Sequence, residues 1–176
     1  MSRSPAPERV VMDSSALLSD CRSRLVAAAH LGYAECFWST WIVAEVARVR
    51  TEWIAQRAAR ERCDGVETRR RLEASRQRVN LMMAELSSDL RSVDYHDAPP
   101  EDLSWLADLD DWPIMQTALV AGAQVLVTHN GKDFPLGERR NGVLCLHSRD
   151  YLARLYKSYP EAEADIAGYL ETLQSG

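Results

Sequence analysis

The sequence predicts a single α/β domain built on a mostly parallel sheet of about five strands. Short runs of β-forming residues alternate along the chain with longer segments whose apolar residues recur at helical spacing, a pattern typical of a parallel sheet with helices on both faces. A length of 176 residues, of which 46% are hydrophobic and 27% charged, suits one domain with a sizeable core. We therefore expect three layers, with the sheet between two layers of helices.

The chain is predicted to begin with a short flexible tail followed by a buried strand. Residues 1–8 are small, polar and rich in proline, so we expect them to lie outside a single domain of residues 9–176. The run ERVVMD at 8–13 consists of β-forming residues closed by an acid, which favours a strand that ends at Asp13. Apolar residues at helical spacing then predict a helix over residues 16–31.

A second strand and a long helix follow. Residues 35–38 are predicted to form the strand, and the helix begins near Trp41. Glu45 lies one turn from both Trp41 and Val49 on the apolar stripe of this helix, so its side chain is expected to face the core or a cleft. The structural alternative is a pair between Glu45 and a neighbouring arginine on a partly exposed face.

The segment 57–90 is predicted to form an arginine-rich arm of two helices that extends from the domain. A break between the helices is expected at Asp64 and Gly65. The arm has an apolar seam that can pack on the domain or on a partner. This seam consists of Leu72, Val79, Leu81, Met82, Leu86 and Leu90.

The net charge of −5 conceals a separation of charge along the chain. Residues 48–78 contain ten arginines and five acids, whereas residues 94–111 contain seven acids and no lysine or arginine. The basic segment can guide a phosphate backbone toward an acidic site, receive a partner peptide, or simply be a solvated face. The arginines expected to contact a substrate or partner are Arg57, Arg60, Arg69, Arg70 and Arg71.

The second half of the chain continues the alternation. The predicted strands cover residues 91–95, 124–128 and 143–146, and the predicted helices cover residues 113–120, 149–157 and 160–173. Ser148 is the expected cap of the helix over residues 149–157. Proline in the first turn of the helix over residues 113–120 places Asp111 at or just before the start of that helix.

Acidic residues are expected to meet at one edge of the sheet. Asp13 ends the first strand, and Asp133 lies just after the strand over residues 124–128. The helix that precedes this strand packs antiparallel to it, which brings Asp110 or Asp111 back to the same side. Two carboxylates held close together repel each other unless they share a cation or a proton. The arrangement therefore predicts a site for a divalent metal ion.

Four acidic motifs in this order resemble those of the PIN-domain nucleases. They are VVMDSSALL around Asp13, WSTWIVAEV around Glu45, DLDDWPIMQTAL around Asp111, and VLVTHNGKDFP, which contains Asp133. The segment VLCLHSRDYLARL is similar to the last strand and helix of that family. The resemblance covers residues 10–155 and is closest to the branch that includes VapC-type toxins. It implies a PIN-like three-layer sandwich.

The resemblance further implies a metal-dependent endoribonuclease. In such an enzyme, four acids hold Mg²⁺ or Mn²⁺, which offsets the charge of the phosphate and lowers the pKa of the attacking water. The corresponding residues here are Asp13, Glu45, Asp111 and Asp133. Asp13 and Asp111 are expected to bind the metal directly, while Glu45 and Asp133 act as further or water-mediated ligands.

Other polar side chains near the acids are expected to orient carboxylates or water through hydrogen bonds. They are Ser15, Thr128 and Asn130. Many relatives carry an acid where Asn130 stands, so either Asn130 or Asp133 completes the site.

Asp108, Asp110 and Asp111 compete for a single role in the site. Asp111 is favoured because it precedes Ile114 by three residues, the D-x-x-I spacing of the family. Asp110 is then a helix cap or a residue that supports the metal ligands.

The resemblance also implies partners, namely an RNA substrate, a small antitoxin protein that covers the site, and a second copy of the chain in a homodimer. No apolar stretch approaches the roughly 20 residues that a membrane span needs, so no membrane contact is expected. The four cysteines lack C-x-x-C spacing, which argues against a zinc cluster and favours reduced thiols in the cytoplasm.

Two other functions are alternatives to the nuclease hypothesis. A non-catalytic PIN-like module could use the arginine-rich arm to bind RNA or a protein in a regulatory role. A phosphatase of the haloacid dehalogenase type would need a second acid two residues after Asp13, where this chain has Ser15.

Overall fold

A computed structural model describes residues 6–175, which form an α/β fold around a six-stranded, mostly parallel sheet. The strand order is β3-β2-β1-β4-β6-β5, and neighbouring strands are parallel except for β5 and β6. The strands are β1 (Glu8–Met12), β2 (Ala34–Trp38), β3 (Arg91–Ser92), β4 (Val125–Val127), β5 (Arg139–Arg140) and β6 (Val143–Leu146). The predicted α/β class with a mostly parallel sheet is therefore confirmed.

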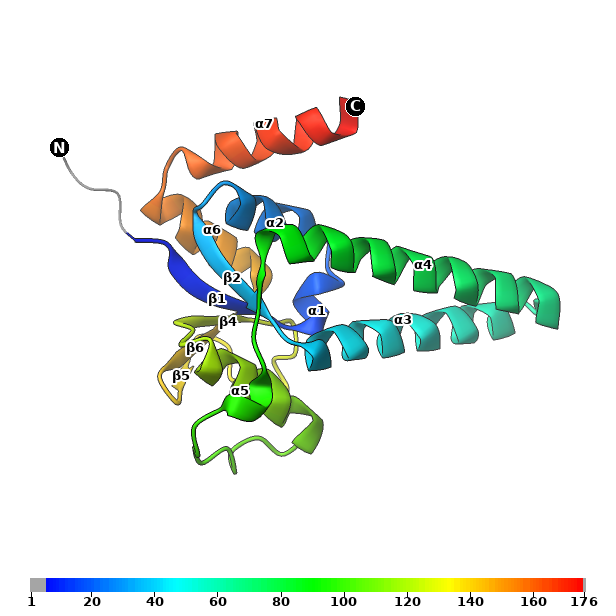
Figure 1. Cartoon of the computed structure of the whole chain (residues 1–176), viewed down its shortest axis with the longest axis horizontal. Coiled ribbons are helices and arrows are strands. Elements are labelled where there is room, and N and C mark those ends of the chain that lie inside the picture. Colours follow the sequence, from blue (N-terminus) through cyan, green and yellow to red (C-terminus); the bar gives the residue numbers. More distant parts are fainter. Residues whose placement is uncertain (1–5, 176) are drawn as a thin grey trace.

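Helices flank the sheet on both sides. In Figure 1, α5 lies below the sheet, and α2 and α6 lie above it. The helices of the described residues are α1 (Ser14–Leu17), α2 (Arg22–His30), α3 (Thr40–Arg60), α4 (Gly65–Asp89), α5 (Trp112–Val120), α6 (Ser148–Ser158) and α7 (Ala162–Ser175). Within residues 6–175, no helix has the length and apolar character needed to cross a membrane.

The two central strands are buried on both faces. Val10, Val11 and Met12 of β1 are fully buried, as are all three residues of β4. Such strands read as continuous apolar runs because neither face of the sheet meets water. The central strands could therefore be located from the sequence.

The expected number of about five strands was too low because β5 was missed. Its two residues, Arg139 and Arg140, are charged and exposed and carry no apolar pattern. They join β6 through Asn141 and Gly142, which both have positive φ values, 48° and 81°. An Asn-Gly pair before a β-forming run is a strong hairpin signal, so the sequence did contain evidence for this strand.

The expected single helix over residues 16–31 is divided into two. α1 ends at Leu17, and α2 begins at Arg22. The hydroxyl group of Ser19 donates a hydrogen bond to the carbonyl of Ala16 and accepts one from the amide of Cys21. Serine competes in this way with the helical hydrogen bonds of the backbone, which explains the interruption.

One predicted strand, one helix cap and the predicted N-terminal tail also differ from expectation. The strand predicted over residues 91–95 is limited to Arg91–Ser92, because a 3₁₀ turn covers Tyr95–Asp97. His147, rather than Ser148, caps α6 and accepts a hydrogen bond from the amide of Arg149. In the tail predicted over residues 1–8, residues 1–5 lie outside the described part, and Glu8 already belongs to β1.

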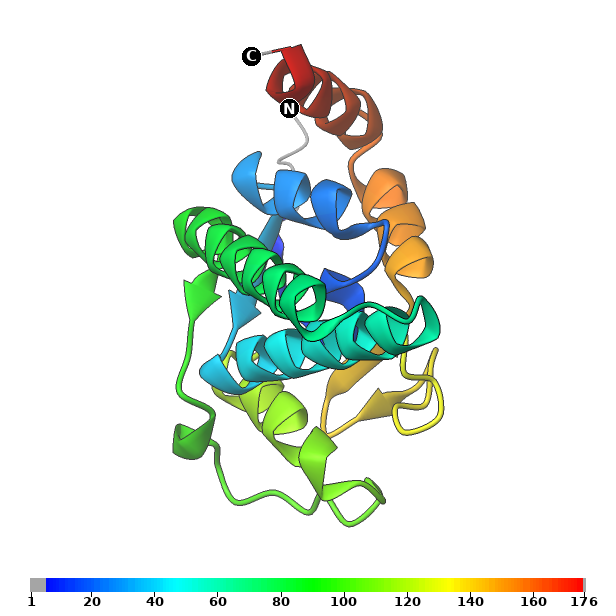
Figure 2. The ribbon, with the colours of Figure 1, turned by 90° about the vertical axis from the view of Figure 1, so that its right-hand side faces the viewer.

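The helices α3 and α4 form an arm, which projects from the body of the domain (Figure 1) and points toward the viewer in Figure 2. The prediction of a two-helix arm over residues 57–90 placed its start too late, because α3 runs without a break from Thr40 to Arg60. The chain reverses between Arg60 and Gly65, and Asp64 caps α4 by accepting a hydrogen bond from the amide of Glu67. Val79, Met82, Leu86 and Leu90 of the apolar seam are buried. Leu81 was wrongly included, since it is 65% exposed on the other side of α4.

The return from α5 to β4 depends on Gly122, which has a φ of +56°. A side chain at this position would be strained, and a Cβ atom would lie 3.2 Å from Nη1 of Arg9. We expect Gly122→Ala to lower the free energy of unfolding by about 1–2 kcal/mol, the cost of left-handed backbone for an L-residue. Urea unfolding measures this difference. Gly168→Ala is the matched control, because Gly168 lies in α7 with open space around it and its replacement is expected to stabilise by about 0.5–1 kcal/mol.

Candidate functional site

The carboxyl ends of the central strands place polar side chains side by side. Asp13 follows β1, Thr128 follows β4, and Ser148 comes two residues after β6. The amide of Asp13 donates to the carbonyl of Val127, and the amide of Thr128 donates to the carbonyl of Leu146. These bonds extend the parallel pairing by one residue and align the side chains at this edge, where open α/β sheets bind their ligands.

Asp13 is 2% exposed and is held by hydrogen bonds on both carboxylate oxygens. Oδ1 accepts from the amide and the hydroxyl of Ser14. Oδ2 accepts from the hydroxyls of Ser15 and Thr128, at 2.6 and 2.7 Å. The same two hydroxyls accept from the amides of His129 and Asn130, so each is oriented by the turn after β4. This network fixes the Asp13 carboxylate in one orientation.

Glu45 comes from the first half of α3 and faces the same edge. Its Oε2 atom is buried without a hydrogen-bond partner among the described residues. Its ion pair with Arg48 is long, at 3.8 Å. Burial raises the pKa of Glu45, and the charge of Asp13 raises it further, whereas a hydrogen bond from Ser14 and the charge of Arg48 lower it. The Glu45 side chain thus faces a cavity, as predicted, and it also forms the arginine pair of the structural alternative.

Asp111 lies at the N-terminal end of α5, as the proline pattern predicted, and is 6% exposed. Its side chain does not cap the helix, and its Oδ2 atom is buried without a partner among the described residues. Burial, followed by the charges of Asp133, Asp13, Asp108 and Glu45, raises the pKa of Asp111 to about 7. The carboxylate thus lies within electrostatic range of the three other acids predicted for the site.

One cavity of about 400 Å³ joins these groups. Asp13, Glu45 and Asp111 line it together with Ser15 and Asn130. Buried polar atoms nearly always have hydrogen-bond partners, so two unpaired carboxylate oxygens in one cavity call for an explanation. A cation bound between them satisfies both oxygens and reduces the repulsion between the acids.

The donor set fits a hard divalent cation. Carboxylate oxygens, supplemented by an amide oxygen or water, are the ligands that Mg²⁺ and Mn²⁺ prefer. Within residues 6–175, no three acidic, histidine or cysteine side chains are already close enough together to ligate one ion. The acids therefore line a common cavity without forming a closed set of ligands, and the metal remains part of the proposed function.

The two candidates for the last ligand occupy different places. Asn130 lines the acidic cavity, whereas Asp133 is half-buried and is linked to the site through its charge on Asp111. Asp110 is exposed and faces a smaller neighbouring cavity beside Trp41 and Arg48. Asp108, rather than Asp110, caps the 3₁₀ turn before α5. Asp111 is thus the member of the acidic triplet that lines the main cavity.

Three residues near the site were not among the predicted site residues. Ser14 contacts Asp13 through its amide and its hydroxyl, as expected of a residue at the start of a helix after an N-cap acid. Trp53 lines the acidic cavity, two turns after Glu45 on α3, and the helical spacing could have revealed it. His129 stacks on His147 at 4.0 Å, and burial lowers its pKa. This contact joins residues that follow two different strands, so no local sequence pattern predicts it.

The arginines predicted to contact a substrate or partner are divided between two environments. Arg57, Arg70 and Arg71 line a groove between α3 and α4. Arg60 and Arg69 are exposed and are not among the residues that line this groove.

The four cysteines are unpaired, and three of them are buried.

Comparisons with protein-family models, with curated proteins and with solved structures find no match for this chain.

Proposed function

We propose that the protein is a metal-dependent endoribonuclease that hydrolyses RNA phosphodiester bonds at the acidic cavity. The observation that carries this proposal is a pair of buried oxygens without partners among residues 6–175, Oε2 of Glu45 and Oδ2 of Asp111, in the cavity that Asp13 also lines. Asp13, Glu45 and Asp111 would hold Mg²⁺ or Mn²⁺, and Asn130 or Asp133 would complete the set. When bound, the cation neutralises charge on the phosphate and makes water easier to deprotonate.

The residues of the chain have separate roles in this proposal. Ser15 and Thr128 donate hydrogen bonds to Oδ2 of Asp13 and keep this carboxylate turned toward the cavity. The carboxylate is therefore already oriented before substrate binds. Asp111 holds a proton on its carboxyl group below about pH 7 and releases it at higher pH. Asp13 and Asp111 are largely buried, so their charges act on each other more strongly than the charges of exposed side chains would.

A more specific proposal follows from the resemblance to the VapC-type branch of PIN-domain nucleases. We propose that the protein is the toxin of a type II toxin–antitoxin pair and acts in the cytoplasm as a homodimer, with a small antitoxin that covers the acidic cavity. The order and spacing of the four acidic motifs support this proposal.

The first test is RNA cleavage by the purified protein with and without metal. We expect cleavage of a labelled RNA with internal cuts in millimolar Mg²⁺ or Mn²⁺, and none in excess chelator, because unneutralised carboxylates repel the phosphate. Gel electrophoresis of the products distinguishes internal cuts from shortening at the ends. Cleavage that persists in chelator, or binding of RNA without any turnover in either metal, would refute the proposal. The second outcome would instead favour a regulatory RNA-binding module.

A further inference from the structure

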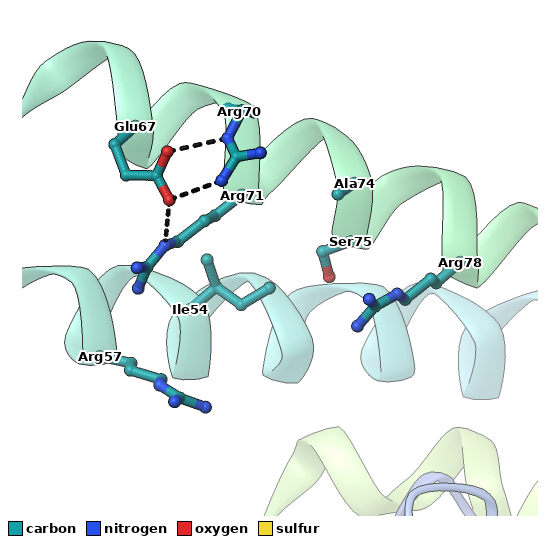
Figure 3. Close-up of a pocket in the computed structure, with 8 residues that line it drawn as sticks. All are labelled: Ile54, Arg57, Glu67, Arg70, Arg71, Ala74, Ser75 and Arg78. Carbon is teal, nitrogen blue, oxygen red and sulfur yellow. Dashed lines mark hydrogen bonds and ion pairs between the residues drawn. The ribbon is translucent and has the colours of Figure 1, made fainter. Parts of the chain in front are cut away.

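A groove with a surplus of positive charge lies between α3 and α4, away from the acidic cavity. It has a volume of about 390 Å³, and Figure 3 shows the side chains of both helices around it. Four arginines line the groove together with one carboxylate, that of Glu67. The arginines are Arg57 from α3 and Arg70, Arg71 and Arg78 from α4.

The ion pairs around the groove leave part of this charge unneutralised. Glu67 accepts from Arg70 and Arg71, as drawn in Figure 3. Glu61, at the turn of the arm, pairs with Arg57 and Arg71. The ion pairs that the described residues form here do not include Arg78. Two carboxylates thus face four guanidinium groups, and the groove is suited to an anion.

The positive charge continues from the groove toward the body of the domain. Arg50 of α3 is half-buried, and burial lowers its pKa, as do the nearby charges of Arg22 on α2 and Arg78 on α4. Arg22 of α2 and Arg78 of α4 therefore lie within electrostatic range of Arg50. Like charges held together in this way are destabilising until an anion binds between them.

Trp53 connects the positive groove with the acidic cavity. It is 54% exposed and lines the acidic cavity together with Val49. Glu45, Val49, Trp53 and Arg57 follow one another at intervals of four residues, so they form one stripe along α3. At 1.5 Å per residue, this stripe spans roughly 18 Å from the acidic cavity to the groove.

We propose that the groove between α3 and α4 binds the phosphate backbone of a single nucleic-acid strand, and that Trp53 stacks on a base of the same strand beside the acidic cavity. An exposed aromatic ring beside a groove with a surplus of positive charge is the arrangement by which proteins hold unpaired strands, since every base offers a face for stacking. The idea that the bound strand is also the strand that is cleaved rests on the proposed function. The binding of the strand does not depend on it.

The test measures binding separately from cleavage. The probe is a fluorescein-labelled oligouridine of about 12 nucleotides, and fluorescence anisotropy is recorded in chelator with Asp13→Asn as the parent protein, so that the probe stays intact. We expect Trp53→Ala to weaken binding about 5- to 100-fold, while Trp53→Phe retains most of the affinity because it keeps an aromatic face. Arg57→Gln and Arg78→Gln should each reduce the slope of log affinity against log salt by about 0.7.

Two matched controls lie on the same arm. Arg76→Gln removes an arginine two residues from Arg78 that does not line the groove, and Leu81→Ala removes an apolar side chain that is 65% exposed. Both variants should bind as the parent does. A hairpin RNA of equal length should bind more weakly than oligouridine, because its bases are already stacked on one another.

Several results would overturn the inference. The inference is wrong if Trp53→Ala binds oligouridine as tightly as Leu81→Ala does, or if Arg78→Gln leaves the salt slope unchanged. It is also wrong if the protein does not bind oligouridine at all, and the groove would then be a site for a protein partner. Binding as expected without cleavage by the unmutated protein would refute the nuclease proposal and keep the groove. If the unmutated protein cleaved RNA but the groove variants bound oligouridine as the parent does, the nuclease proposal would stand and the groove proposal would be refuted.

Discussion

Replacement of Asp13 by asparagine is expected to reduce RNA cleavage by more than about 100-fold, because it removes one of the carboxylates that hold the metal. The fold should survive the change. Asparagine keeps an oxygen that can accept from Ser14, and the hydroxyls of Ser15 and Thr128 can rotate to accept from the new amide. Initial rates of cleavage at saturating Mg²⁺ measure the effect.

Asp20→Asn is the matched control for this experiment. Asp20 is an exposed acid close to α1 that is not among the residues lining the acidic cavity, so its replacement should leave the rate unchanged. Circular dichroism and the unfolding midpoint of Asp13→Asn should remain close to those of the unmutated protein. If the asparagine variant cleaved RNA at the normal rate, Asp13 would have no part in the reaction.

Replacement of Asp111 by asparagine is expected to stabilise the metal-free protein at alkaline pH. Folding raises the pKa of Asp111 from its ordinary value of 3.8 to about 7. Between pH 3.8 and pH 7, the Asp111 carboxyl group is therefore protonated to a greater extent in the folded state than in the unfolded state. Stability of the unmutated protein therefore falls as the pH rises from about 4 to about 7, and the loss is complete above that range. The full shift corresponds to at most about 4 kcal/mol.

The repelling carboxylates can move apart, so we expect a smaller gain for Asp111→Asn, about 2 kcal/mol at pH 8 in chelator. This gain should vanish below pH 4, where Asp111 is neutral in both the folded and the unfolded state. For a chain of this length it corresponds to an increase in Tm of about 4–8 °C. Thermal unfolding at a series of pH values measures it. Asp20→Asn removes the same charge from an exposed position and shows how much of the gain comes from net charge alone.

Metal should stabilise the unmutated protein much more than it stabilises Asp111→Asn. Mg²⁺ or Mn²⁺ is expected to raise the Tm of the unmutated protein, because binding to the folded state alone stabilises it, and to have a much smaller effect on Asp111→Asn. The affinity of the unmutated protein should fall about tenfold per pH unit below pH 7, since the metal displaces one proton. Asp111 would not be a ligand if both proteins responded equally to metal.

The sequence by itself determined the fold class, the central strands and the identity of the acids. β1 and β4 are apolar throughout because they are buried on both faces, and β6 was predicted with its observed bounds of residues 143–146. The start of α5 after Asp111 followed from the proline at its first turn. These features are decided by local patterns of burial and by backbone chemistry, which a single chain displays directly.

Only the tertiary structure decided which of these groups lie together and which lack partners. The hydrogen bond between Asp13 and Thr128 joins residues 115 positions apart, and the placement of Trp53 on the wall of the acidic cavity depends on how α3 packs beside α1. Among the described residues, Oε2 of Glu45 and Oδ2 of Asp111 lack hydrogen-bond partners, which is likewise a product of packing. Burial and hydrogen-bond satisfaction depend on neighbours that are distant in the chain, so the acids could be predicted from the sequence but the missing partners of these two oxygens could not.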